Sequence, residues 1–195
     1  HRQSPLALYV ANEMISKSFS VPATDLEEIL ARNCRISDTA RAARFCRQAE
    51  QACYFCKDIH YPDVPLHTPT FDTTLLSAPI GPGHVTLIDC WASWCGPCRA
   101  AIPKVKALYD KYGRDRFDVI SISLDSKKED WQKALEEEKM PWPQFIAGNR
   151  GYKQLTSRYN ISSIPNLILI DGKGQVVCNT FSPEEIRIEL EQILR

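Results

Sequence analysis

The chain has 195 residues, of which 44% are hydrophobic and 25% charged, an ordinary composition for one globular domain or for one domain with an extension. Its 24 basic and 24 acidic residues balance, so the chain lacks the excess of positive charge that would indicate nucleic-acid binding. No apolar run approaches the ~18 residues of a transmembrane helix, and the first residue is His1 rather than Met, which leaves room for a leader, a membrane anchor or a further domain upstream.

The first third of the chain is predicted to be helical. Ser4 and Pro5 form a helix start, a capping residue followed by a first-turn proline, and apolar residues then recur at helical spacing. Five prolines between residues 61 and 83 break any later helix and indicate extended or looping chain. We therefore expect a helical extension over residues 1–58 and a separate domain over residues 59–195.

Strands and helices alternate in the rest of the chain. The predicted strands cover residues 85–90, 117–124, 166–170 and 175–178, and the predicted helices cover residues 96–112, 127–139, 151–159 and 182–194. This alternation is typical of a layered α/β domain with a largely parallel sheet. The Asp171-Gly172 turn predicts that the last two strands form a hairpin.

Two of the cysteine pairs have C-x-x-C spacing, Cys53/Cys56 and Cys95/Cys98. Cys95 follows an apolar strand and a short turn, so it lies at the N-terminus of the next predicted helix. Free backbone N–H groups and the helix dipole favour a thiolate there, and such sites lower a cysteine pKa from ~8.5 to ~3.5–7.5. Cys98 lies one turn into the helix, close enough to form a disulfide with Cys95.

This placement assigns the chemistry. Cys95 attacks a substrate disulfide and forms a mixed disulfide, and Cys98 resolves it. Pro97 fixes the turn between them. The alternatives are a structural disulfide or half of a zinc site, but no second pair of Cys or His ligands stands nearby in this domain. We therefore expect dithiol–disulfide exchange with no metal and no bound cofactor.

Residues 89–98, Asp-Cys-Trp-Ala-Ser-Trp-Cys-Gly-Pro-Cys, resemble the active-site segment of thioredoxin. Over about residues 70–195 the chain is similar to the TlpA/ResA-like branch of bacterial extracytoplasmic thiol–disulfide oxidoreductases. That branch carries a helix-containing insert, here about residues 126–152. The helical first third resembles, much less specifically, the helices that precede the redox domain in Bacteroidetes members. The resemblance implies a thioredoxin-like three-layer α/β sandwich with an N-terminal helical extension.

Further roles follow from the resemblance. Asp89 matches the buried acid behind the disulfide, where a raised pKa would let it relay a proton to or from Cys98; taken alone, it would be an ordinary acid near a strand end. Ile164-Pro165 matches the cis-proline loop, whose backbone would pair with a substrate strand. Pro103 matches the kinking proline of the active-site helix.

The resemblance also implies a surface for substrate, formed by Trp94, Gly96, Pro97, Ile164 and Pro165. Two positions depart from the family pattern. Cys90 stands where an aromatic residue is usual, and Ala101 stands where ResA-like proteins carry a glutamate that tunes the thiols. Asp89 is therefore left as the only obvious acid of the site.

The other cysteines allow several interpretations. Cys53 and Cys56 lack the strand-turn-helix context. With Cys46 and His60 they offer four zinc ligands. The alternatives are a local disulfide among Cys34, Cys46, Cys53 and Cys56, or free, partly buried thiols packed between helices. Cys90 and Cys178 lie on predicted strands and are expected to be small buried hydrophobic residues.

The predicted function is reduction or isomerisation of protein disulfides outside the cytoplasm, in the periplasm. By resemblance, the Gly96-Pro97 dipeptide indicates the reducing side of the family. The expected partners are protein disulfide substrates and an upstream thiol electron donor, with a membrane anchor possible upstream of the chain. A thiol peroxidase is the nearest alternative, disfavoured because Ser93 and Trp94 precede Cys95 in place of a Thr-x-x-Cys setting. The other alternative is a binding or scaffold module that docks through the helical first third and in which the redox site is secondary.

Overall fold

The computed structural model describes residues 61–113, 116–159 and 161–195. The predicted helical extension and its boundary near residue 58 lie outside these residues. The same holds for the zinc and disulfide alternatives at Cys34, Cys46, Cys53, Cys56 and His60.

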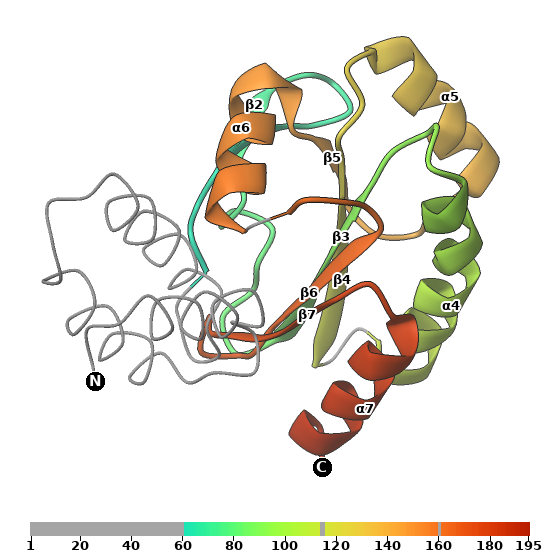
Figure 1. The fold of residues 1–195 in the computed structure, drawn as a ribbon. Coiled ribbons are helices and arrows are strands. Elements are labelled where there is room, and N and C mark those ends of the chain that lie inside the picture. Colours follow the sequence, from blue (N-terminus) through green and yellow to red (C-terminus); the bar gives the residue numbers. More distant parts are fainter. Residues whose placement is uncertain (1–60, 114–115, 160) are drawn as a thin grey trace, which may run out of the picture.

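The described residues form one sheet of seven strands with four helices (Figure 1). The strands are β1 (Pro65–His67), β2 (Thr73–Leu75), β3 (Val85–Trp91), β4 (Phe117–Ser123), β5 (Gln144–Ile146), β6 (Asn166–Ile170) and β7 (Val176–Thr180). The helices are α4 (Gly96–Tyr112), α5 (Lys128–Glu138), α6 (Gly148–Arg158) and α7 (Pro183–Ile193). The strand order across the sheet is β2-β1-β5-β4-β3-β6-β7.

All eight elements predicted after residue 84 are present, and α4 and β6 have the predicted bounds. The structure adds β1 and β2 in the proline-rich stretch and β5 between α5 and α6. Each of these three strands has three residues, too few to show an alternating pattern. They become strands because their backbones pair with neighbours, not because of a local signal. The predicted insert over residues 126–152 contains α5 and β5.

The prediction of a largely parallel sheet is wrong, because the sheet is mixed. β3 pairs in parallel with β4, and β4 with β5. The β1–β2, β1–β5, β3–β6 and β6–β7 pairs are antiparallel. The order of strands and helices along the sequence does not show at which end of the sheet each strand begins. After α6, β6 begins beside the carboxyl end of β3, where Asn166 faces Cys90, so β6 runs antiparallel to β3. The predicted β6–β7 hairpin is confirmed.

Helices cover both faces of the sheet, which confirms the three-layer α/β sandwich (Figure 1). Successive side chains of a strand point to opposite faces. One face packs against α6 and includes Ile88, Ile120, Ile168 and Leu155. The other packs against α4 and α7 and includes Leu87, Val119, Val105 and Leu190. Each such buried aliphatic side chain contributes about 1.5–3 kcal/mol, and together they hold the ends of β3 and β4 in place beneath α4.

Candidate active site

Cys95 and Cys98 form a disulfide at the N-terminus of α4, with an S–S distance of 2.03 Å. β3 ends at Trp91, a short turn follows, and Cys95 is the N-cap residue of α4. The Cys95 Sγ accepts a hydrogen bond from the backbone N–H of Cys98 at 3.2 Å. The same N–H would stabilise a Cys95 thiolate after reduction, as would the positive end of the helix dipole. The predicted pairing and its place on the helix are confirmed.

A buried aspartate holds the turn before Cys95. Asp125 lies two residues beyond the end of β4 and is 5% exposed. Its carboxylate accepts hydrogen bonds from the backbone N–H and the hydroxyl of Ser93, at 2.9 and 2.7 Å, and from the hydroxyl of Ser123 at 2.7 Å. It therefore ties the cysteine turn to the end of the neighbouring strand. The sequence reasoning missed Asp125, although an acid directly after an apolar strand beside the cysteine strand was a usable signal.

The Ile164-Pro165 peptide bond is cis, as predicted. The carbonyl oxygen of Ile164 lies 3.8 Å from the Cys95 Sγ. In the oxidised form this sulfur carries no hydrogen, so the approach is a contact and not a hydrogen bond. The backbone of the loop thus lies directly beside the sulfur that would attack a substrate.

Asp89 is 4% exposed and lies on the face of β3 that α4 covers, the face of Leu87 and Trp91. Burial raises its pKa from 3.8 to about 6, and a hydrogen bond from Ser121 acts in the opposite direction. The Ser121 Oγ donates to the Asp89 Oδ2 at 2.9 Å and accepts from the Trp142 Nε1 at 2.8 Å. A pKa of about 6 lets a carboxyl group exchange a proton near neutral pH.

Ser121 and Trp142 were not predicted as part of the site. Ser121 is the register partner of Asp89 on β4, so its proximity depends on strand pairing. Trp142 lies in the loop between α5 and β5 and is linked to the acid only through Ser121. No pattern along the chain marks either residue.

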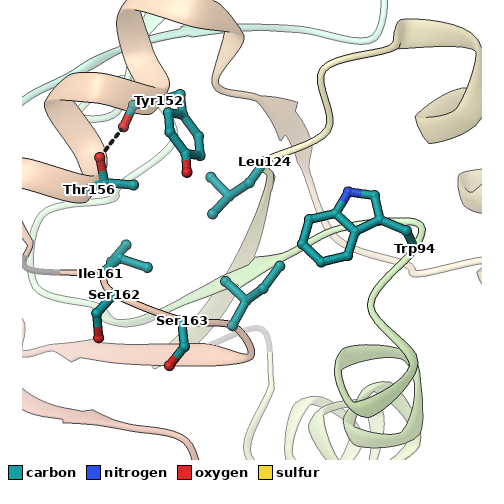
Figure 2. A pocket seen from close by; sticks show the side chains of 8 residues that line it. Trp94, Leu124, Tyr152, Thr156, Ile161, Ser162 and Ser163 are labelled. Atoms are coloured by element: carbon teal, nitrogen blue, oxygen red, sulfur yellow. Dashed lines mark hydrogen bonds between the residues drawn. The ribbon is translucent and has the colours of Figure 1, made fainter.

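A cavity of about 290 Å³ opens beside the cis-proline loop. It is lined by Trp94, Leu124, Tyr152, Thr156, Ile161, Ser162, Ser163 and Ile164. Figure 2 shows Trp94 and Tyr152 on opposite sides of it, with Leu124 between them. Trp94 is 69% and Tyr152 47% exposed, and every lining residue is uncharged. An uncharged, partly aromatic cavity favours an apolar side chain over a charged one.

Of the predicted substrate surface, Trp94 and Ile164 line this cavity. Gly96 and Pro97 are exposed in the first turn of α4, and Pro165 is half-buried. The sequence reasoning missed the wall that α6 supplies, because Tyr152 and Thr156 lie far from the cysteines along the chain.

The remaining predicted residues are two cysteines in the core and a proline on the exposed side of α4. Cys90 and Cys178 are both buried, as expected. Cys90 points to the α6 face, away from Asp89, and burial raises the pKa of its thiol well above the usual value. Pro103 lies inside α4. Among the described residues, no group of three or more His, Cys, Asp or Glu side chains could hold a metal ion, and no helix is long and apolar enough to cross a bilayer.

The cysteine pair lies at a helix N-terminus beside a cis-proline, and the domain is a mixed sheet with helices on both faces. Together these features define a redox-active thioredoxin fold. Comparison with known proteins agrees. A family model described as thioredoxin-like matches residues 83–176. The thiol-disulfide oxidoreductase ResA of Geobacillus kaustophilus is 26% identical over 114 residues, which cover 57% of this chain and 64% of the relative. The sporulation thiol-disulfide oxidoreductase A of Bacillus subtilis is 25% identical over 104 residues, covering 52% of this chain and 61% of the relative.

Solved structures extend the comparison. A Chlorobium tepidum structure, described as a thiol:disulfide interchange protein DsbE, is 31% identical with a TM-score of 0.60, covering 71% of this chain and 95% of that one. The thioredoxin domain of a Bacteroides vulgatus thiol-disulfide oxidoreductase shares the fold with a TM-score of 0.65, at 24% identity over 71% of this chain and 98% of that one. The chain belongs to the thioredoxin-like family of thiol–disulfide oxidoreductases. It spans just under two thirds of the length of the two curated relatives.

Proposed function

We propose that this protein reduces or isomerises protein disulfides by exchange with the Cys95/Cys98 dithiol. The observation that carries the proposal is the Cys95–Cys98 disulfide at the N-terminus of α4, with the Ile164 carbonyl 3.8 Å from the Cys95 sulfur. A helix terminus lowers the pKa of an N-cap thiol, and the adjacent backbone offers a substrate strand a place to pair.

The reaction has two exchange steps. The Cys95 thiolate attacks one sulfur of the substrate disulfide, so that a mixed disulfide forms and the other substrate sulfur leaves as a thiolate, which takes up a proton. Cys98 then loses its proton and attacks the Cys95 sulfur, which releases the second substrate thiolate. Two electrons pass from the site to the substrate, and the site is left as the Cys95–Cys98 disulfide.

Asp89 is proposed as the base for the second step. Cys98 is buried and must lose a proton before it can attack. Asp89 lies on the sheet face that α4 covers, and its pKa of about 6 suits transfer near neutral pH. In the reverse reaction the same carboxyl would return the proton to Cys98.

Substrate is proposed to bind across the cis-proline loop. An extended segment pairs with the backbone of Ile164, and an apolar side chain beside its cysteine enters the cavity between Trp94 and Tyr152. Gly96 and Pro97 present a small, flat edge of α4 to the substrate disulfide, and Pro165 supports the loop.

The direction proposed is reductive, supported by the Gly96-Pro97 dipeptide. Each turnover leaves the site oxidised, so a reductase needs an upstream thiol donor. We place the protein outside the cytoplasm, in the periplasm, where protein disulfides persist, and propose a membrane anchor upstream of the chain. The likeness to extracytoplasmic relatives supports this location.

The test is reduction of a protein disulfide by the dithiothreitol-reduced protein, followed as loss of its Cys95 and Cys98 thiols. We expect one disulfide reduced per protein, no activity for Cys95→Ser, and a stable mixed disulfide for Cys98→Ser. Cys178→Ser is the control, since this buried cysteine lies on β7 and should not be needed. A Cys95→Ser protein that remains active would overturn the proposal, and faster oxidation by peroxide than by disulfides would favour a peroxidase.

The reduction potential of the pair decides the direction. Pairs of this kind range from roughly −270 mV for reductants to about −120 mV for a strong oxidant. A value near the first supports a donor-fed reductase, and a value near the second makes the protein a disulfide donor.

A further inference from the structure

A buried tryptophan stands behind the proposed acid of the site. Trp142 is 3% exposed and lies between α5 and β5. Its indole packs edge-on against Tyr109 of α4, with ring centroids 5.4 Å apart. Its Nε1 donates to the Ser121 Oγ at 2.8 Å, and this hydroxyl donates to the Asp89 Oδ2 at 2.9 Å. The chain Trp142–Ser121–Asp89 is therefore continuous, and all three members are buried.

The donor and acceptor inventory sets the direction of these bonds. An indole N–H can only donate, so the Ser121 oxygen must accept from it. The Ser121 hydroxyl has one proton of its own to give. The neighbouring acceptors are the Asp89 carboxyl and the Met140 thioether, whose sulfur lies 3.9 Å away and is a weak acceptor. With one lone pair occupied by the indole, the hydroxyl proton points to Asp89.

We propose that Trp142 is a positioning residue of the redox site, which acts through Ser121 to keep a hydroxyl proton on Asp89. The consequence for turnover rests on the proposed function of Asp89 as the acid of the site. Since Trp142 lies in the segment between β4 and α6, this contact connects that segment to the chemistry.

The surroundings of Asp89 make this hydrogen bond decisive. Burial raises its pKa, and the Ser121 bond is the contribution that lowers it. On β6 the register partner of Asp89 is Leu167, which is apolar. The neighbouring titratable group is Cys90, which follows Asp89 in β3 but points to the other face. Cys98 of α4 is held in the disulfide of the oxidised protein and does not titrate. Removal of the oriented hydroxyl should therefore raise the pKa of Asp89 further.

The test follows the carboxyl carbon of Asp89 by NMR during a pH titration of the oxidised protein labelled with ¹³C-aspartate. Because Ser121→Ala removes a hydrogen bond to a charged group, we expect it to raise the midpoint by about one to two pH units. Trp142→Phe should raise it by about half a unit, because the hydroxyl remains but is no longer oriented. The double variant should match Ser121→Ala, since Trp142 acts only through Ser121.

Trp131→Phe is the matched control. Trp131 is also fully buried, and its indole N–H has no hydrogen-bond partner in the described part of the chain. The same ring substitution there should leave the Asp89 midpoint unchanged. Equal shifts in the two tryptophan variants, or additive shifts in the double variant, would overturn the proposal.

A second measurement needs no variant. The indole N–H resonance of Trp142 in the unmodified protein should titrate with the midpoint of Asp89, while that of Trp131 should not. If the chemical shift of the Trp142 N–H did not change as Asp89 titrates, the proposal would be overturned, even if the Trp142 variant failed to fold.

These titrations use the oxidised protein without substrate, so they separate the inference from the proposed function. If the midpoints shift as expected but the pH dependence of disulfide reduction does not follow them, the positioning of Asp89 stands and its role as base falls. If the rate profile depends on Asp89 but Trp142→Phe leaves the midpoint unchanged, the inference alone fails.

Discussion

Replacement of Asp89 by asparagine should stabilise the protein at neutral pH. In the folded protein burial raises the pKa of this carboxyl from 3.8 to about 6. The folded state therefore binds the proton more tightly than the unfolded state, and the free energy of unfolding falls as the pH rises from about 4 to about 6. A shift of about two units corresponds to about 3 kcal/mol at 1.36 kcal/mol per unit. Above pH 6 the ionised carboxylate imposes this whole cost.

Asparagine has nearly the same shape, does not ionise, and keeps an oxygen that can accept the Ser121 hydrogen bond. Urea unfolding of the oxidised protein should show a gain approaching 3 kcal/mol for Asp89→Asn at pH 8 and little change at pH 3.5. Asp110→Asn, the same change at an exposed position of α4, should stay within about 0.5 kcal/mol at both pH values. Destabilisation of Asp89→Asn at pH 8, or an equal gain at both pH values, would refute the reasoning.

Three further predictions concern the turn, the cavity and the packing of α6. Asp125→Ala removes a buried acceptor of three hydrogen bonds and should cost about 1–3 kcal/mol in urea unfolding, whereas no loss would mean that the turn does not need this anchor. Tyr152→Ala should lower kcat/KM several-fold for a protein disulfide. It should not lower kcat/KM for hydroxyethyl disulfide, because this small substrate cannot reach the cavity wall. The control is Phe181→Ala, at an exposed aromatic residue outside the cavity, which should change neither value. Gly151→Ala should lower the free energy of unfolding by about 1–3 kcal/mol, and with it the melting temperature, because the added Cβ would collide with the backbone carbonyl of Pro65. An unchanged melting temperature would show that α6 can shift away from β1.

The sequence was sufficient wherever a signal is local. Cys95 and Cys98 predict their own chemistry, because an apolar strand, a turn and a helix start stand directly around them. β6 is a continuous, largely apolar run, and α4 begins directly after the cysteine turn. The cis bond before Pro165 was predicted from a motif, not from physics, because a cis X-Pro bond depends on the surrounding fold.

The sequence alone determined the redox pair, the helix that presents it and the layered α/β class, because each depends on residues within one or two turns of chain. Only the tertiary structure decided the antiparallel course of β6, the three short strands, and the partners of Asp89. Strand register brings Ser121 to the acid. Trp142 bonds to Ser121 from a loop that lies more than fifty residues from Asp89 in sequence. Such contacts are selected by packing and by the need to pair buried polar groups, and a linear pattern carries no record of them.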